Sequence, residues 1–149
     1  MSICKNMVDF NVSISDQEKA LHYKIMAHYN DKDISGKADI FLKKLIHYKS
    51  QKCQKCCSVY KDCIHHSMKN EDIIGHLKFF YPNGYDFKQE NMRHGVGQIT
   101  LDHIIEDLLK INGKMIYVFS TTKFMENFLK KHDFEHSSQF EFQYYLYLQ

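Results

Sequence analysis

Apolar and polar residues alternate near the start of the chain. Over residues 8–14 every second residue is apolar, and the residues between them are polar. A period of two places the apolar side chains on one face of a strand. The sequence therefore predicts a strand over residues 8–14 with one buried face.

A different spacing follows this strand. Ser15 or Asp16 is suited to cap a helix, because its side-chain oxygen can accept a hydrogen bond from a free N–H of the first turn. Apolar residues then recur at helical spacing at Leu21, Ile25, Met26 and Tyr29. We therefore expect a helix here, a break over residues 31–36 and a second helix over residues 37–49.

The middle of the chain contains one clear strand pattern. Ile73–Tyr81 is rich in apolar and aromatic residues, and the turn-forming run Pro82, Asn83 and Gly84 follows it. Residues 85–92 fit either a short strand or a loop. The pattern predicts a strand that ends at this turn.

The helical pattern of residues 98–112 is more regular. Its apolar side chains share one face and are Leu101, Ile104, Ile105, Leu108 and Ile111. Gly113 stands where a left-handed cap would end the helix. Residues 115–119 form a short apolar run, which predicts a buried strand directly after the helix.

A further helix and strand are predicted near the C-terminus. Ser120 or Thr121 can cap a helix in which Phe124, Phe128 and Leu129 point inward. Residues 140–148 alternate between apolar and polar side chains, as in a strand. Helices thus lie between strands, and we expect one α/β domain over residues 1–149, with a mixed central sheet flanked by helices.

Composition narrows the class of protein. Of 149 residues, 44% are hydrophobic and 26% are charged, as in ordinary globular proteins. The net charge of +2 is too small to indicate nucleic acid, and no apolar stretch approaches the roughly 20 residues of a membrane helix. We therefore expect neither nucleic acid nor a membrane as a partner. Five Cys residues without a secretory leader indicate a cytoplasmic protein with reduced thiols.

Two glycines precede the helix of residues 98–112. In the segment MRHGVGQ, residues 92–98, Gly95 and Gly97 permit positive φ and let backbone amides converge on one point. The start of the helix adds N–H groups without a partner and a partial positive charge. Such a turn suits a phosphate or pyrophosphate, although two glycines before a helix also occur as a plain tight turn.

The elements from this turn onward resemble the GCN5-related N-acetyltransferase family. That family has a (Gln/Arg)-x-x-Gly-x-(Gly/Ala) turn, then a helix, a strand, a helix and a closing Gly-Phe, and Gly95, Gly97 and Phe134 occupy the matching positions. The resemblance covers residues 92–149 and implies that they are the cofactor-binding half. It implies an N-acetyltransferase that takes acetyl-CoA as cosubstrate. The residues assigned to the coenzyme are Arg93, His94, Gly95, Val96, Gly97, Gln98 and Val118.

The acceptor implied by this resemblance is a primary amine. An amino sugar, a polyamine, a small amine and a protein or peptide amine all remain open, and so does a homodimer. Three positions depart from the family's pattern: Met92 at the start of the turn, Asp133 before Phe134, and Leu129 in place of the usual catalytic Tyr. Because Leu cannot protonate a leaving thiolate, another residue must do so or catalysis relies on positioning.

The resemblance implies direct transfer between strands that splay beside the coenzyme. A base is expected near the amine, which must lose a proton before it attacks the thioester, and a backbone N–H is expected to hold the carbonyl oxygen. Glu90 is a candidate base, with His76 and Asp86 as alternatives. Tyr117 and Ser120 are candidate proton donors, and Tyr117 also fits plain core packing.

Cysteine and histidine residues cluster over residues 53–66. The candidate zinc ligands are Cys53, Cys56, Cys63 and one of His65 or His66. Cys57 crowds the pair and no second C-x2-C follows, so we expect no bound metal. Two alternatives to the enzyme remain. One is a small zinc-stabilised binding or regulatory module, and the other is a catalytically inactive family member that binds coenzyme A.

Overall fold

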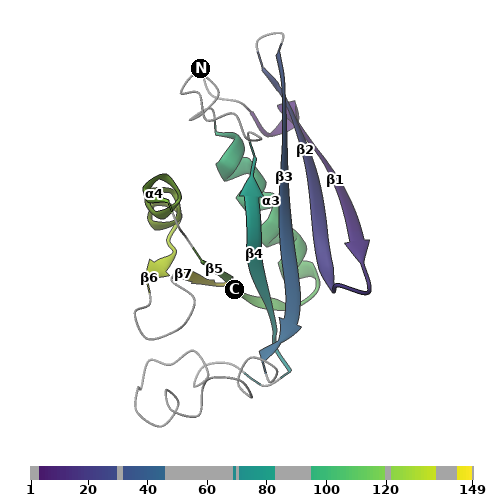
Figure 1. Cartoon of the computed structure of the whole chain (residues 1–149), viewed down its shortest axis with the longest axis vertical. Helices are drawn as coiled ribbons and strands as arrows, with labels where there is room; N and C mark the ends of the chain where they lie inside the picture. Colours follow the sequence, from purple (N-terminus) through teal and green to yellow (C-terminus); the bar gives the residue numbers. More distant parts are fainter. Residues whose placement is uncertain are drawn as a thin grey trace. The chain divides into compact units, whose positions relative to one another are not determined.

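The structure is a computed structural model that describes residues 4–29, 32–45, 69, 71–82, 95–119, 122–136 and 144–148. Its elements are η1 (Lys5–Met7), β1 (Val8–Ser15), β2 (Ala20–Tyr29), β3 (Lys32–Lys44), β4 (Ile73–Tyr81), α3 (Val96–Lys110), β5 (Gly113–Val118), α4 (Lys123–Lys131), β6 (Glu135–His136) and β7 (Tyr144–Tyr147) (Figure 1). The strands form a seven-stranded sheet in the order β1-β2-β3-β4-β5-β7-β6. The predicted mixed α/β class is confirmed.

The strand pairings explain why the sheet is mixed. β2 pairs antiparallel with both β1 and β3. β5 pairs parallel with β4, and α3 is the helix that connects these two strands along the chain. β7 pairs antiparallel with β5 and with β6. A parallel pair needs such a crossover helix, whereas the antiparallel strands need only short turns.

The chain divides into two compact units. Unit 1 consists of Met1–Phe41 and Leu77–Asp107, and unit 2 consists of Leu42–His76 and Leu108–Gln149. β3, β4 and α3 each contribute residues to both units. No helix in the described part of the chain is long and apolar enough to span a membrane.

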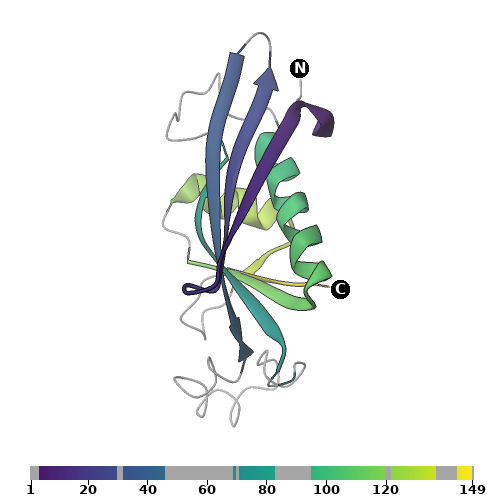
Figure 2. The same cartoon turned by 90° about the vertical axis from the view of Figure 1, so that its right-hand side faces the viewer.

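In unit 1, α3 lies along the apolar face of β1 and β2 (Figure 2). The buried side chains of this unit include Tyr23, Ile25, Ala38, Ile40, Leu101 and Ile104. The ring of His103 on α3 stacks on Phe10 of β1, with 4.1 Å between centroids. The Tyr23 hydroxyl donates a hydrogen bond to Asp107 at 2.8 Å. Apolar burial and one polar contact thus both hold α3 to the strands.

The predicted helix after residue 16 is wrong, because this segment is β2. Leu21, Tyr23, Ile25 and Ala27 are all buried, so its true period is two. The Ser15 side chain accepts a hydrogen bond from Glu18 N and stabilises a turn rather than a helix. Lys19 completes this turn with φ 51°. β1 and β2 are therefore joined by four residues.

The predicted break over residues 31–36 and the helix over residues 37–49 are also wrong. β3 runs without interruption through Lys32–Lys44, and Ala38 and Ile40 are buried with a polar residue between them. Residues 46–49 lie outside the described part of the chain. A Cβ atom at Gly36 would collide with the backbone carbonyl of Pro82, so this glycine permits a close approach and does not break the strand.

The remaining unit 1 predictions hold with smaller changes. The strand predicted over residues 8–14 is β1, but only its start is buried, since Val12 and Ile14 are exposed. The predicted strand Ile73–Tyr81 is β4, which the two units share. α3 confirms the third predicted helix and begins two residues earlier, at Val96.

Asn112, and not Gly113, carries the left-handed backbone after α3. Its φ is 61°, a conformation that Asn tolerates better than most residues. Gly113 is the first residue of β5, and a Cβ atom there would lie 2.9 Å from the backbone oxygen of Leu108. The glycine is therefore required by close packing at the start of the strand.

Unit 2 has β5 at the centre of its core. Its buried side chains include Leu45, Ile74, Leu108, Met115, Ile116, Val118, Leu129, Phe134, Tyr144 and Leu148. The predicted strand at residues 115–119 is confirmed as β5. β7 confirms the last predicted strand over Tyr144–Tyr147, while residues 140–143 lie outside the described part.

The cap of α4 differs from the prediction. Thr122 is the N-cap, and its side chain accepts a hydrogen bond from Met125 N at 3.2 Å. Leu129 is fully buried, as expected, and Phe128 is partly buried. Phe124 is 49% exposed, so it does not point inward as predicted. In this nine-residue helix the buried stripe is narrower than the apolar spacing indicated.

Candidate active site

One candidate feature is the turn that opens α3 in unit 1. Gly95 has φ 91°, which a side chain would resist, so this glycine uses the positive φ that its lack of a side chain permits. Its carbonyl oxygen accepts from Ile99 N at 3.1 Å, the first hydrogen bond of the helix. The N–H groups of Val96, Gly97 and Gln98 therefore have no carbonyl acceptor within the helix.

These amides are suited to an anion. The first turn of α3 contains no acidic residue, so no carboxylate of that turn repels an anion from the positive end of the helix dipole. Gly97 lies in the helix itself and is partly exposed. Because it is a glycine, it places no Cβ atom beside these amides. Arg93 and His94, assigned to the same group by the resemblance, lie outside the described residues. The described part of this turn has the chemistry of a phosphate site.

A separate candidate feature lies in unit 2, where the described parallel pairing between β4 and β5 ends. Its last described pair is His76 with Tyr117, and β4 continues to Tyr81 beyond that pair. The two rings stack with 4.8 Å between centroids and 6° between planes. Phe119, just after β5, contacts both rings edge-on. The described parallel pairing of β4 with β5 thus ends at these stacked rings.

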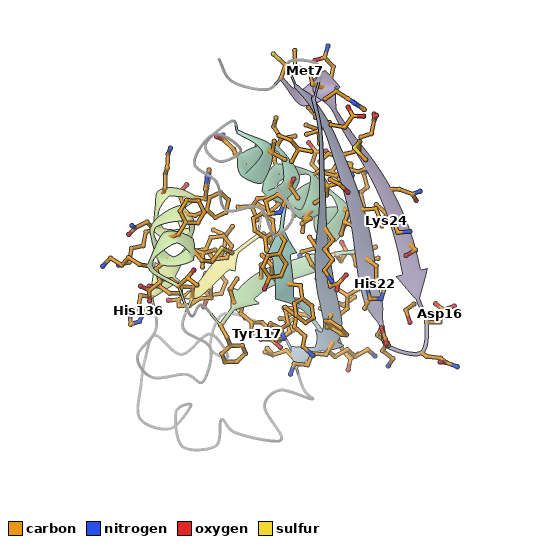
Figure 3. All side chains as sticks on the ribbon, turned by 45° about the horizontal axis from the view of Figure 1, so that its top comes forward. Met7, Asp16, His22, Lys24, Tyr117 and His136 are labelled. Carbon is orange, nitrogen blue, oxygen red and sulfur yellow. The ribbon has the colours of Figure 1, made fainter. Side chains whose placement is uncertain are left out.

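Tyr117 is a buried phenol at this position (Figure 3). It is 3% exposed, and this burial raises its pKa to about 12. The hydroxyl therefore keeps its proton at neutral pH. The ammonium of Lys43 lies 5.7 Å from the centroid of its ring, within cation–π range. Tyr117 thus combines core packing with a proton that it can donate.

The end of α4 shows why Asp133 can replace the family's glycine. Asp133 has φ 69°, the left-handed conformation that glycine adopts most easily. The next residue, Phe134, is buried and donates its N–H to the Leu129 carbonyl at 3.0 Å. This departure therefore changes the residue while keeping the backbone conformation.

Tyr144 is a second buried phenol that the sequence did not single out for chemistry. It lies on β7 opposite Val118 of β5, the residue that the resemblance assigns to the coenzyme. Burial, followed by the charge and hydrogen bond of Glu126 on α4, raises the pKa of Tyr144. Only the pairing of β5 with β7 brings these residues together, and no short-range pattern could have indicated it.

Several predicted site residues lie outside the described part of the chain. They are the candidate bases Glu90 and Asp86, the candidate donor Ser120, and the Cys/His segment with Cys53, Cys56, Cys63 and His65. Of the predicted catalytic residues only Tyr117 is described, and it lies beside the alternative base His76. Among described residues, no three His, Cys, Asp or Glu side chains gather as a metal site would require.

Comparisons with known proteins bear on the fold. No family model matches the sequence, and no curated protein matches it. Among solved structures the chain is similar to AtaT, a GCN5-related N-acetyltransferase, in "AtaT complexed with acetyl-methionyl-tRNAfMet". The TM-score is 0.53 at 9% identity, and the match covers 88% of this chain and 72% of that one.

This likeness answers two of the expectations drawn from the sequence. The tRNA bound to AtaT conflicts with the expectation, drawn from the small net charge, that no nucleic acid is a partner. The similar chain arrangement agrees with the resemblance of residues 92–149. This chain has the GCN5-related N-acetyltransferase fold.

Proposed function

We propose that this protein is an acetyl-CoA-dependent N-acetyltransferase that acts on a primary amine. The observation that carries the proposal is the stacking of His76 on Tyr117 at the last described pair of the parallel ladder between β4 and β5. The glycine turn at the start of α3 supports it independently, because its amides suit the pyrophosphate of coenzyme A. The fold shared with AtaT also supports the proposal, at the level of chain architecture alone.

The proposed reaction is a direct transfer in which acetyl-CoA supplies the activated acyl group. The amine nitrogen forms a bond to the thioester carbon, and the carbon–sulfur bond then breaks. His76 accepts a proton from the amine, directly or through water. A backbone N–H near Val118 stabilises the oxyanion as negative charge develops. A phenol, Tyr117 or Tyr144, donates a proton toward the departing sulfur.

Two tyrosines compete for the donor role because Leu129 cannot fill it. Tyr117 has the stacked base candidate beside it, and Tyr144 has the carboxylate of Glu126. Both hydroxyls remain protonated near neutral pH, since burial raises the pKa of each. We assign the role to Tyr117, because it shares the end of the parallel ladder with His76.

Experiment must identify the acceptor amine. Amino sugars, polyamines, small amines and protein amines are candidates, and the acetyl-methionyl-tRNA in the AtaT complex adds an amine carried on aminoacyl-tRNA. The zinc-module alternative predicts one zinc per chain from residues 53–66, and elemental analysis of the purified protein measures this directly.

The test combines ligand binding with acyl transfer. Acetyl-CoA at about 100 times its Kd should stabilise the folded state by about 2.7 kcal/mol, while NAD and ATP at equal concentration should do much less. Labelled acetyl should then move to at least one acceptor class. A melting transition that acetyl-CoA leaves unmoved, with no heat in calorimetry, refutes the proposal. Stabilisation without transfer to any amine favours the inactive coenzyme-binding alternative.

A further inference from the structure

Two lysines face each other directly across the β2–β3 ladder of unit 1. Lys24 of β2 pairs with Lys37 of β3, and both side chains are exposed. Like charges in this position destabilise a sheet by up to about 1 kcal/mol. Neither lysine has an ion-pair partner among the described residues. The pair therefore holds positive charge that an external anion can neutralise.

The positive charge continues onto β4, where it alternates with aromatic rings. The Lys37 ammonium lies 5.3 Å from the ring centroid of Phe79. The Lys78 ammonium lies 5.1 Å from the ring of Phe41 and 5.7 Å from that of Phe79. Phe79 is 37% exposed, although a phenylalanine would gain by burial. We call Lys24, Lys37, Phe41, Lys78 and Phe79 the lysine–aromatic face.

Four carboxylates on these strands and the turn beside them contact histidines, and none forms an ion pair with Lys24, Lys37 or Lys78 among the described residues. His22, two residues from Lys24 on the same face of β2, contacts Asp39 at 2.8 Å and Glu18 at 3.2 Å (Figure 3). His28 contacts Asp33 at 2.7 Å and Asp9 at 3.0 Å. Each of these carboxylates contacts an imidazole. The His22 cluster lies toward one end of β2 and the His28 cluster toward the other. The lysines lie in the row between the two histidine clusters.

We propose that the lysine–aromatic face binds a single-stranded segment of nucleic acid. Phosphates would neutralise the opposed lysines, and unpaired bases would stack on the rings of Phe79 and Phe41, the two contacts that single-strand binders combine. An anionic membrane would use the charge but not the flat rings. The inference concerns unit 1 alone and does not depend on acyl transfer.

The measurement is fluorescence anisotropy with a labelled 12-nucleotide RNA of mixed sequence, at 50 and 200 mM salt. The double variant Lys24→Glu/Lys37→Glu should weaken binding at least tenfold. It should also reduce the slope of log K against log salt by about 1.4, the value for two single-strand phosphate contacts. Phe79→Leu, which keeps apolar bulk but removes the flat ring, should weaken binding about fivefold or more.

Two matched controls come from α4, whose exposed residues lie in unit 2. Lys123→Glu/Lys131→Glu makes the same change in net charge, and Phe124→Leu removes a ring that is more exposed than that of Phe79. Both controls should leave the affinity within twofold, and circular dichroism confirms that every variant is folded. The proposal is overturned if the wild type does not bind at 50 mM salt. It is also overturned if the control lysines matter as much, or if Phe79→Leu has no effect. Stabilisation by acetyl-CoA should survive in all these variants, which separates this result from the proposed function.

Discussion

The rings of His76 and Tyr117 lie face to face at the last pair of the parallel ladder between β4 and β5, with only 6° between their planes. Each residue comes from a strand on a different side of α3 in the sequence. The parallel register therefore places a base candidate and a phenol side by side at the last described pair of the ladder. A buried phenol with a pKa of about 12 stays protonated throughout the physiological range.

Removing the phenolic proton should slow the reaction without damaging the fold. Tyr117→Phe keeps the stacked ring, and we expect kcat to fall about 100-fold while the Kd for acetyl-CoA is unchanged. Tyr147→Phe, on an exposed ring of β7, is the matched control. Tyr144→Phe should lower kcat by much less. If Tyr144→Phe alone abolishes the rate, the donor is Tyr144 and the assignment to Tyr117 is wrong.

Gly97→Ala should separate stability from coenzyme binding. Gly97 is the second residue of α3, so alanine should stabilise the helix by about 0.5 kcal/mol. The added methyl group would at the same time approach the amides that we assign to the pyrophosphate. We expect a higher melting temperature together with at least fivefold weaker acetyl-CoA binding by calorimetry. A stabilised variant with unchanged affinity would show that the phosphate binds elsewhere.

Tyr23→Phe should report on the contact between α3 and β2. The lost hydrogen bond has a carboxylate as acceptor and lies in a partly buried place, so its removal should cost about 1 to 2 kcal/mol. The urea midpoint should fall with little change in the m-value. Tyr145→Phe removes a similar bond to Glu135, but at an exposed position, and should cost less. Equal losses in the two variants would contradict a special role for the Asp107 contact.

His28 and His22 should make stability depend on pH. Hydrogen bonds that the imidazole of His28 donates to Asp33 and then Asp9 raise its pKa, and those that His22 donates to Asp39 and then Glu18 raise its pKa. Because the folded pKa lies above the unfolded value of about 6.5, this stabilisation is complete below that pH. It disappears as pH rises through the raised folded values.

The corresponding measurement is the free energy of unfolding from pH 5.5 to pH 9. The difference between wild type and His22→Gln/His28→Gln should be largest near pH 6 and should shrink toward pH 9. His136→Gln, at an exposed position in unit 2, serves as the control. A difference that stays constant with pH, or that grows toward high pH, would contradict the assigned pairing.

The sequence was sufficient where a single period was unambiguous. The apolar spacing of α3 left no competing pattern, and the run in β5 was too short and too β-branched for a helix. In β2 both periods fit: Leu21, Ile25 and Met26 suit a helix, while Leu21, Tyr23 and Ile25 suit a strand. Pairing with β1 and burial under α3 decided the outcome, and these long-range interactions have no local signal.

The same limit applies to the candidate site. The glycine turn is a local feature, and the sequence alone indicates that Gly95 permits the positive φ that it adopts. Tyr117 could be named as a candidate, but its contact with His76 depends on a register between strands that α3 separates. The sequence does not reveal the lysine–aromatic face for the same reason, since the apolar spacing assigns Lys24 and Lys37 to two different predicted helices.

The distance in sequence between the first strands of unit 1 and helix α3 has a consequence for biosynthesis. β1, β2 and the part of β3 that belongs to unit 1 end at Phe41, whereas α3, which covers the apolar face of β1 and β2, reaches Asp107 much later in unit 1. At about 5 to 20 residues per second, the ribosome needs roughly 3 to 13 s to make the chain from residue 41 to residue 107. During that time no helix is packed against the side chains of Tyr23 and Ile25. The uncompensated lysines on the opposite face then repel neighbouring nascent chains, and they help to keep the growing polypeptide soluble before any ligand is bound.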